Sequence, residues 1–465
     1  MPEHAHHADV VIVGAGAAGL SAAHRLTSAG VTTVVLEAAP CVGGRMSTEK
    51  VDGFRLDRIG QLLTTSYPEL RRTPGLDSLV LRPFAPGILV HSDGRHHRAA
   101  ERLPARSARG ALTTARALAS APLAPLAART PTRSASGTPP GSTPRSSPRS
   151  TRSTPLGTPL DQARLGSALA RIAATPVDRL LARPELPAAD ALSARGLPSR
   201  TIEGFLRPLL SALLCDPGLT TSSRCADLAL HAFARGRLCL PEGGAEALPE
   251  HLAAALPPGV VRTGVRVTSV STSSVGTAEH GEFTCRAVLL ATDARAAAEL
   301  LPGLRVPPFH EVSVVHHAAP EPPLDGPALL LDADRAGPVA HTAVISQVDP
   351  SRAPVGRVLV SSTVLGPPPE ESAVRTHLAA LYGTPTDRWE RLAVHHTREA
   401  VPAMSPPHDI RRPVRLLSGL YVCGDHRGTS TVQGALHSGR RAAHAVLTDF
   451  GITPSYTAET LPAAA

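Results

Sequence analysis

The stretch Asp9-Val-Val-Ile-Val-Gly14-Ala-Gly16-Ala-Ala-Gly19 decides the fold. Its apolar first part, Asp9 to Val13, predicts a short buried strand, and apolar residues then recur at helical spacing from Leu20 to Leu26. Gly30 is a typical helix stop, and Thr33 to Leu36 predicts a second buried strand. A strand, a glycine-rich turn, a helix and a strand together indicate the opening unit of a nucleotide-binding α/β fold.

The three glycines have separate tasks in a dinucleotide site. Gly14 makes the tight turn, Gly16 lets the backbone approach a pyrophosphate, and Gly19 lets the helix pack on the strand. The helix N-terminus then faces the anion. Glu37 ends the second strand, where its carboxylate can accept both ribose hydroxyls of an adenosine. The nucleotide contacts predicted in this unit are Gly14, Gly16, Ala17, Ala18, Gly19, Glu37 and Ala38.

FAD and NAD share this pattern, and the next segment separates them. Cys41-Val-Gly-Gly-Arg45 and Gly53-Phe-Arg-Leu-Asp57-Arg-Ile-Gly60-Gln61 resemble the flavin-containing amine oxidase and phytoene desaturase superfamily. In that family the double glycine and the arginine pass beside the pyrophosphate and the flavin. Glycine permits close backbone approach, and arginine can neutralise phosphate. The resemblance implies non-covalent FAD, with contacts from Gly43, Gly44, Arg45, Gly60, Gln61 and Leu62.

Later segments continue the resemblance. The glycine pair in Leu240 to Pro249, the strand Val265 to Val270 and the strand end at Asp293 are similar to family motifs. The last motif runs from Gly419 to Ala435; there Asp425 would hold the ribityl or pyrophosphate region. The amides that follow would face the pyrimidine end of the flavin, where a helix N-terminus stabilises negative charge. The implied contacts are Val267, Ala291, Thr292, Gly424, Asp425, Val432 and Gln433.

The predicted fold class is α/β, with a Rossmann-like FAD-binding domain of the glutathione-reductase type built from discontinuous segments. An α+β substrate-binding domain is inserted into it, since 465 residues are enough for about two or three domains. Further strands are predicted at Ala287 to Ala291 and Leu420 to Cys423, and helices at Gly434 to Leu447 and after a capping Asp161. The expected FAD-binding segments are 1–65, 236–300 and 410–450, and the substrate-binding segments are 66–235 and 301–409.

The net charge of +8 is concentrated in one region. Between Glu101 and Asp161 there are nine arginines and no acidic residue, and subtracting nine from +8 leaves −1 for the rest of the chain. We therefore expect no nucleic-acid partner. Thr130 to Pro155 contains only Thr, Pro, Arg, Ser, Ala and Gly, which predicts a disordered surface insertion at 130–155. Peripheral membrane contact by this segment stays open.

Targeting and metal signals are weak. The chain has no apolar run of about 18 residues and no apolar stretch in Met1 to Asp9, so we expect a cytoplasmic protein. The six cysteines lack metal-site spacing and are expected to be buried free thiols. His4, His6 and His7 predict a mobile terminus rather than a metal site.

The type of flavin chemistry is inferred mainly from residues that are absent. Amine oxidases of the family usually place a lysine and aromatic side chains near the flavin. This chain has one lysine, Lys50, and 3% aromatic residues. We therefore expect hydride transfer from a small apolar substrate to flavin, as in the family's desaturases. A flavin amine oxidase and a non-redox flavin isomerase remain alternatives.

A third alternative is a flavin-free lipid-binding protein, because GDP-dissociation inhibitors share the fold. The presence of Glu37, Arg45 and Asp425 together argues against it. No catalytic residue and no oligomeric state is assigned from the sequence. His426 ranks first among the histidines for nearness to the cofactor because it directly follows Gly424-Asp425.

Overall fold

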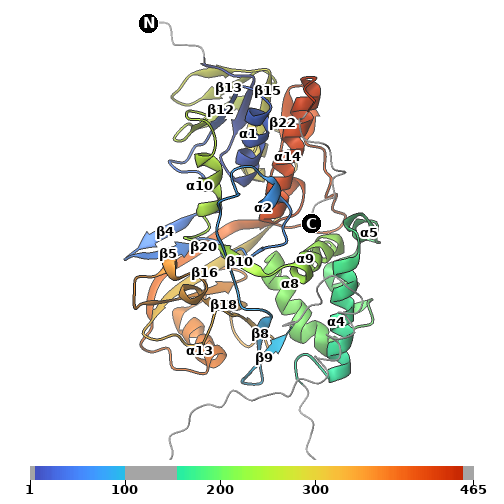
Figure 1. The fold of residues 1–465 in the computed structure, drawn as a ribbon, viewed down its shortest axis with the longest axis vertical. Coiled ribbons are helices and arrows are strands. Elements are labelled where there is room, and N and C mark those ends of the chain that lie inside the picture. The colour runs from blue at the N-terminus through green and yellow to red at the C-terminus, as the bar shows by residue number, and fades with distance from the viewer. Residues whose placement is uncertain (1–5, 100–153, 454–465) are drawn as a thin grey trace, which may run out of the picture.

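The computed structural model describes residues 6–99 and 154–453, and these form a mixed α/β fold with several sheets (Figure 1). A six-stranded sheet joins three distant parts of the chain, and all its strands except the antiparallel β21 run parallel. Its central strands are apolar throughout because both faces are covered. In spatial order the strands are β11 (Val261–Arg262), β3 (Thr33–Leu36), β2 (Val10–Val13), β15 (Ala287–Leu290), β22 (Leu420–Val422) and β21 (Arg415–Leu417).

The first and last long helices pack against each other beside this sheet (Figure 1). Helix α1 spans Ala17–Ser28 and α14 spans Val432–Asp449. The hydroxyl of Ser21 donates to the carbonyl oxygen of Leu436 at 3.0 Å, and both groups are buried. A Cβ on Gly439 would lie 2.1 Å from the carbonyl oxygen of Ala18, so glycine is what allows the two helices to meet so closely. Helix α10 (Ala247–Ala254) packs on the other side of α1.

Two expectations about the smaller sheets are corrected. The strand expected at Val265 to Val270 is shorter: β12 covers Val267–Val270, and it lies in a separate four-stranded sheet. His6–His7 is not a mobile end: it forms strand β1, which pairs in parallel with β14. His4 lies outside the described residues. The order of this sheet is β1 (His6–His7), β14 (Glu282–Thr284), β13 (Ser274–Thr277) and β12 (Val267–Val270).

A seven-stranded sheet forms the lower part of the molecule in Figure 1, with α13 (Glu371–Tyr382) beside it. Two small sheets link it to the six-stranded sheet: β6 (Leu63–Thr64), β10 (Leu238–Pro241) and β7 (Leu81–Pro83), and the hairpin of β4 (Thr48–Val51) and β5 (Phe54–Asp57). The seven strands are, in order, β20 (Glu390–Pro402), β16 (Phe309–Ala319), β19 (Val358–Val364), β18 (His341–Val344), β17 (Leu329–Asp332), β8 (Ile88–Ser92) and β9 (Arg95–Ala99).

Helices between residues 159 and 235 form a helical layer beside the seven-stranded sheet. Asp161 does not cap the first of them as expected. The helix begins at Pro159 and its N-cap residue is Thr158. The Thr158 side chain accepts from the Asp161 N–H, and the Asp161 carboxylate accepts from the Thr158 N–H. The layer contains α4 (Pro159–Ala174), α5 (Val177–Leu181), α6 (Ala188–Ser193), α7 (Ser199–Thr201), the π-helical turn η1 (Ile202–Leu206), α8 (Arg207–Leu214) and α9 (Ser223–Arg235).

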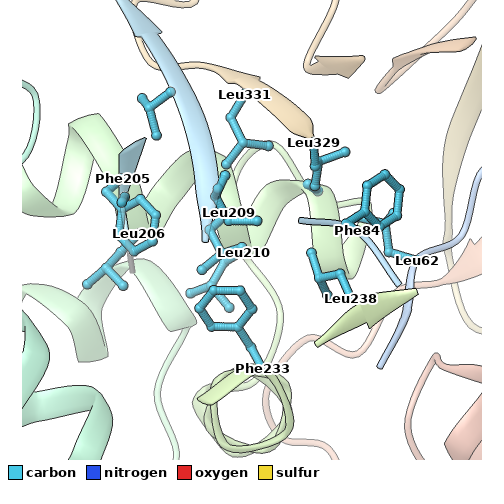
Figure 2. Close-up of a cluster of buried hydrophobic side chains, with 14 of the residues drawn as sticks. Leu62, Phe84, Phe205, Leu206, Leu209, Leu210, Phe233, Leu238, Leu329 and Leu331 are labelled. Atoms are coloured by element: carbon cyan, nitrogen blue, oxygen red, sulfur yellow. The ribbon is translucent and has the colours of Figure 1, made fainter. Parts of the chain in front are cut away.

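Figure 2 shows a cluster of buried apolar side chains between these layers. Phe205, Leu209 and Phe233 from the helices face Leu329 and Leu331 of β17, and all five side chains are buried. Burying such side chains stabilises the fold by about 1.5–3 kcal/mol each. The remaining short elements are α2 (Glu69–Arg72), α11 (Ala294–Leu300), α12 (Ile345–Val348), η2 (Pro350–Arg352) and η3 (Asp425–Arg427).

Three further expectations concern the insertion, the thiols and the membrane. Of the predicted disordered segment 130–155, only Thr154 and Pro155 lie within the described residues. All six cysteines are free, and five are buried as expected, but Cys41 is exposed. Within residues 6–99 and 154–453, no helix combines the length and the apolar character needed to cross a membrane.

Buried histidines predict a loss of stability in mild acid. Burial lowers the pKa of His341 and His426 to about 4 and that of His316 to about 3. The unfolded chain takes up these protons near pH 6.5 and the folded chain does not, so stability falls as pH decreases from about 6.5 to 4. For His341 alone the loss at pH 4 is on the order of 3 kcal/mol.

Urea unfolding at pH 8, 6 and 5 measures this effect. The free energy of unfolding is expected to decrease at each step. In His341→Phe its slope against pH should be smaller by the contribution of about one proton. Equal free energies at pH 8 and pH 5 would contradict the prediction.

Candidate functional site

A cavity of about 710 Å³ lies at the carboxyl ends of the parallel strands of the six-stranded sheet. Val13 and Leu36 end two of these strands and line it, as do Ala291 and Gly424, which follow β15 and β22. Ligands of open α/β sheets bind in this position, outside the carboxyl ends of the strands. We therefore take this cavity as the candidate site.

The N-terminus of α1 faces the middle of the cavity. Gly16 is the N-cap residue, no side chain caps the helix, and its first turn carries no acidic residue. The N–H groups of Ala17 and Ala18, which line the cavity, have no acceptor inside the helix. Such an end is suited to bind an anion.

The glycines of this turn differ in what surrounds them. Gly14 has φ +105°, and a Cβ there would lie 2.9 Å from the carbonyl oxygen of Ala291. Gly19 does not line the cavity, and its Cβ would meet the carbonyl oxygen of Gly14 at 2.1 Å, so it serves packing. A Cβ on Gly16 would meet nothing within 4 Å. Gly16 thus has no neighbour that requires glycine, and the space beside it belongs to the cavity.

Glu37 is held rigidly at one end of the cavity. Its Oε2 accepts the N–H of Ala15 at 2.8 Å and its Oε1 accepts that of Ala39 at 2.9 Å. Ala38 and Val267, two of the expected nucleotide contacts, line the same cavity. The carboxylate is therefore oriented before any ligand arrives.

Arg45 and Asp425 join two distant motifs across the cavity wall. The Arg45 Nη2 atom lies 2.7 Å from Asp425 Oδ1, and Arg45 Nη1 donates to the carbonyl oxygen of Ala400 at 2.9 Å. Burial alone would raise the pKa of Asp425, but the charge and hydrogen bond of Arg45 hold it below its ordinary value. Both groups are therefore charged at neutral pH. Gly43 and Gly44, with φ +112° and +58°, carry the chain along the same wall.

The other end of the cavity lies between β10, the N-terminus of α14 and the segment before β6. Ile59, Gln61 and Leu63 line the cavity, whereas Gly60 and Leu62 line a second cavity of about 30 Å³. Residues 59–63 therefore alternate between the two cavities, along a segment that turns where the Gln61 N–H donates to the carbonyl oxygen of Ile59 at 2.9 Å. The Gln61 side chain donates to the carbonyl oxygen of Ser430 at 3.0 Å, which ties the segment to the turn before α14.

Most predicted contacts meet in this cavity, and four lie away from its wall. Gln433 is one of the four. Its side-chain oxygen accepts the N–H of Glu69 at 3.0 Å, whereas the predicted contact is made by its backbone amide. The predicted residues away from the wall are Gly19, Gly60, Leu62 and Gln433. Those that line the cavity are Gly14, Gly16, Ala17, Ala18, Glu37, Ala38, Gly43, Gly44, Arg45, Gln61, Val267, Ala291, Thr292, Gly424, Asp425 and Val432.

Other lining residues were not among the predicted contacts. Alternation along the chain was a usable signal for Ile59 and Leu63, and the helix after Asp293 for Ala296 and Glu299. Ala400 carries no such signal, because only the long strand β20 brings it to Arg45. The missed residues also include Val13, Leu36, Met46, Asp57, Leu240, Pro241, Ala245, Val265, Arg266, Thr268, Asp293, Leu300, Thr431 and Ala435.

The lining restricts the chemistry that side chains can perform. Among the described residues that line the cavity there is no lysine, histidine, cysteine or aromatic side chain. His426 does not line it; its ring packs behind Gly424, where a Cβ would lie 2.7 Å from it. Lys50 is exposed, with its Nζ 3.8 Å from Glu246 Oε1. A redox reaction here would depend on a bound cofactor, because the charged side chains of the wall, such as Glu37, Asp57 and Arg45, cannot themselves accept a hydride.

Comparison with known proteins agrees with this geometry. The sequence profile described as flavin containing amine oxidoreductase matches residues 17–447. The putrescine oxidase of Kocuria rosea is 50% identical over 94 residues, which make up 19% of this chain and 19% of that protein. The chain thus matches about a fifth of this relative's length.

Solved structures match over almost the whole chain at low identity. An oxidoreductase from Methanosarcina mazei has a TM-score of 0.67 and 16% identity, covering 94% of this chain and 99% of the other. A putative protoporphyrinogen oxidase from Exiguobacterium sp. 255-15 has a TM-score of 0.64 and 17% identity, covering 96% and 99%. At such identities the likeness concerns the fold alone.

Proposed function

Because the chain belongs to the flavin-containing amine oxidoreductases, we propose that it oxidises a small apolar substrate with FAD held non-covalently in the 710 Å³ cavity. The observation that carries the proposal is the open space at Gly16 beside the uncapped N-terminus of α1. Nothing within 4 Å would oppose a side chain there, so glycine is best explained by a ligand that fills the space. A pyrophosphate fits both the space and the free N–H groups.

The proposed architecture is a Rossmann-like FAD-binding domain of the glutathione-reductase type, centred on the six-stranded sheet with α1 and α14. Its segments would be 1–65, 236–300 and 410–450. The parallel strands and the cavity at their carboxyl ends support this reading. The seven-stranded sheet and the helical layer would form the substrate-binding part.

Each part of the cavity fits one part of FAD. Glu37, oriented by two backbone amides, would accept the ribose hydroxyls, and the N-terminus of α1 would bind the pyrophosphate. Arg45 would add positive charge beside the phosphates, while Asp425 keeps it in place. The lining residues include no cysteine, histidine or tyrosine within the described chain, which supports non-covalent binding.

FAD, when bound, supplies the acceptor for the hydride that the substrate loses. The chain's own contribution at that end is the N-terminus of α14. The Thr431 hydroxyl accepts from the Gly434 N–H, and the N–H groups of Val432 and Gln433 have no acceptor inside the helix. These groups and the helix dipole would stabilise negative charge at the end of the cavity.

The lining of the cavity supports the proposed substrate class. A cavity lined there by Leu63, Leu240 and Val432, with no lysine or aromatic side chain in its described lining, favours dehydrogenation of an apolar compound. Amine oxidation is the second candidate, favoured by the matched relative that is a putrescine oxidase.

Anaerobic mixing of the purified yellow protein with polyenes, porphyrinogens and amines tests the proposal. We expect the visible flavin absorbance to bleach with a polyene or porphyrinogen and to stay unchanged with amines. Bleaching by amines alone would show that the substrate is an amine rather than an apolar compound, and it would still support a redox function. A colourless protein that gains no flavin absorbance on incubation with FAD would overturn both.

A further inference from the structure

A second group of ligand-bearing side chains lies in the seven-stranded sheet and lines neither cavity. His91, Asp332 and Asp334 each offer one ligand atom, and the three atoms lie within 4.8 Å of one another. We propose that these residues bind one Zn²⁺ ion, which cross-links strand β8 to the chain that leaves strand β17.

The strand register brings the three residues together. β8 and β17 pair in parallel with His91 opposite Asp332, so the two side chains leave the same face of the sheet. The Ala333 N–H donates to the carbonyl oxygen of His91 at 3.0 Å, which continues the pairing past the end of β17. Asp334 then turns back: its carboxylate accepts the Ser92 hydroxyl at 2.7 Å and the Asp93 N–H at 2.8 Å. The group is therefore pre-arranged by backbone and hydrogen bonds.

The state of the His91 ring independently indicates a missing ligand. The residue is only 8% exposed, and neither ring nitrogen has a hydrogen-bond partner among the described residues. Buried polar atoms are nearly always paired, so two unpaired nitrogens on one buried ring require an explanation. The neighbouring ring of His96, 5.9 Å away, differs because its Nε2 contacts the carbonyl oxygen of Leu381 at 2.6 Å. A metal ion at the His91 ring would use one of its free nitrogens.

Asp332 has the supporting contact that metal-binding carboxylates commonly have. Its Oδ2 lies 3.1 Å from the Nε2 of His377, on α13. The Nδ1 of His377 accepts the Val339 N–H, so its proton sits on Nε2 and is donated to Asp332. Outer contacts of this kind orient a ligand toward its ion. His377 is thus a positioning residue, and the other oxygen of Asp332 keeps a lone pair free besides the Asp334 N–H it accepts.

Charge and ligand type favour zinc among divalent ions. Two carboxylates and a neutral imidazole carry a charge of about −2, which one divalent cation balances. Zn²⁺ accepts both imidazole nitrogen and carboxylate oxygen, whereas Mg²⁺ and Ca²⁺ prefer oxygen alone. Asp334 is exposed, so water can reach the fourth position of a tetrahedral site. The ion would hold the edge hairpin of β8 and β9 to β17.

Isothermal titration of the EDTA-treated holoenzyme with ZnCl₂, compared between variants, tests the proposal. His91→Phe keeps an aromatic ring but removes both nitrogens, and we expect it to bind one Zn²⁺ fewer per chain than the wild type. Counting by difference is necessary because His4, His6, His7 and the exposed Cys41 can also take up Zn²⁺. Asp334→Asn, at an exposed position, should weaken binding at least tenfold, and His377→Gln about 10–100-fold.

His341→Phe is the matched control. His341 is also buried with an unpaired Nδ1, but it belongs to no metal-ligand group among the described residues, so this variant should keep the wild-type number of ions. X-ray absorption at the zinc edge should show one nitrogen ligand that disappears in His91→Phe. Equal Zn²⁺ stoichiometry and affinity in the wild type, His91→Phe and Asp334→Asn would overturn the proposal. Flavin content should be the same in all four variants, which separates this result from the proposed redox function.

Discussion

Gly16→Val is expected to give a folded protein that retains little FAD. The residue has φ −78° and ψ 177°, which valine adopts readily, and its Cβ would meet no protein atom within 4 Å. The added side chain instead enters the cavity beside the N-terminus of α1. Overpacking of this kind costs about 1–3 kcal/mol, or about 5- to 150-fold in Kd, while a weaker N-cap costs the fold about 1 kcal/mol or less. The ratio of flavin absorbance to protein and a thermal melt measure the two effects.

Gly19→Ala and Gly14→Ala provide the contrast. Their Cβ atoms would lie 2.1 Å and 2.9 Å from backbone carbonyl oxygens, and Gly14 also has a positive φ. Both variants should lower the melting temperature of the flavin-free protein, which Gly16→Val should hardly change. Normal FAD content in Gly16→Val would show that the cofactor does not pass beside this residue.

Arg352→Met is expected to lower the free energy of unfolding by about 3–5 kcal/mol. Arg352 is fully buried, its Nη2 lies 3.0 Å from Asp57 Oδ2, and its Nε donates to the carbonyl oxygen of Arg55 at 2.9 Å. Removing the guanidinium leaves the largely buried Asp57 carboxylate with neutral donors, the Thr48 hydroxyl and the Ala245 N–H, in place of the positive charge it now contacts. Chemical denaturation of wild type and variant at pH 7.5 measures the loss.

Removing both charges tests whether an unpaired buried carboxylate causes this loss of stability. Arg352→Met combined with Asp57→Asn should be more stable than Arg352→Met alone, because no unpaired charge then stays buried. Arg411→Met is the exposed control: its pair with Asp178 is 60% and 68% exposed, and such pairs contribute at most about 1 kcal/mol. Losses of equal size in Arg352→Met and Arg411→Met would refute the argument.

Local patterns predicted four strands of the six-stranded sheet, β2, β3, β15 and β22, but neither β11 nor β21. β2, β3, β15 and β22 lie buried in one sheet, so each reads as a continuous apolar run. The glycine-rich turn and α1 could be predicted from equally local signals, because the residues that start and stop the helix lie within it or beside it. These signals involve neighbours in the sequence, which is why they can be recognised without the fold.

The errors came from contacts between distant segments. The sequence placed Gly60, Gln61 and Leu62 together, but Gln61 lines the large cavity while Gly60 and Leu62 line the small one. For Gln433 the predicted contact is made by the backbone amide, and no sequence signal indicated that its side chain reaches the backbone of Glu69. No sequence pattern marks His91 as a ligand, because its carboxylate neighbours come from β17 and the chain after it. Only the register of the sheet brings them together.

The packing of α1 on α14 has a consequence for biosynthesis. Ser21 and Leu436, whose groups form a buried hydrogen bond, are 415 positions apart. At about 5–20 residues per second, a ribosome needs roughly 20–80 s to add the second partner after the first. During that time the nascent chain has β2 and β3 but lacks the strand and helix that complete the cavity wall. Stable capture of the cofactor therefore has to wait until translation is almost finished, and a chaperone that shields the early strands would raise the yield of active protein.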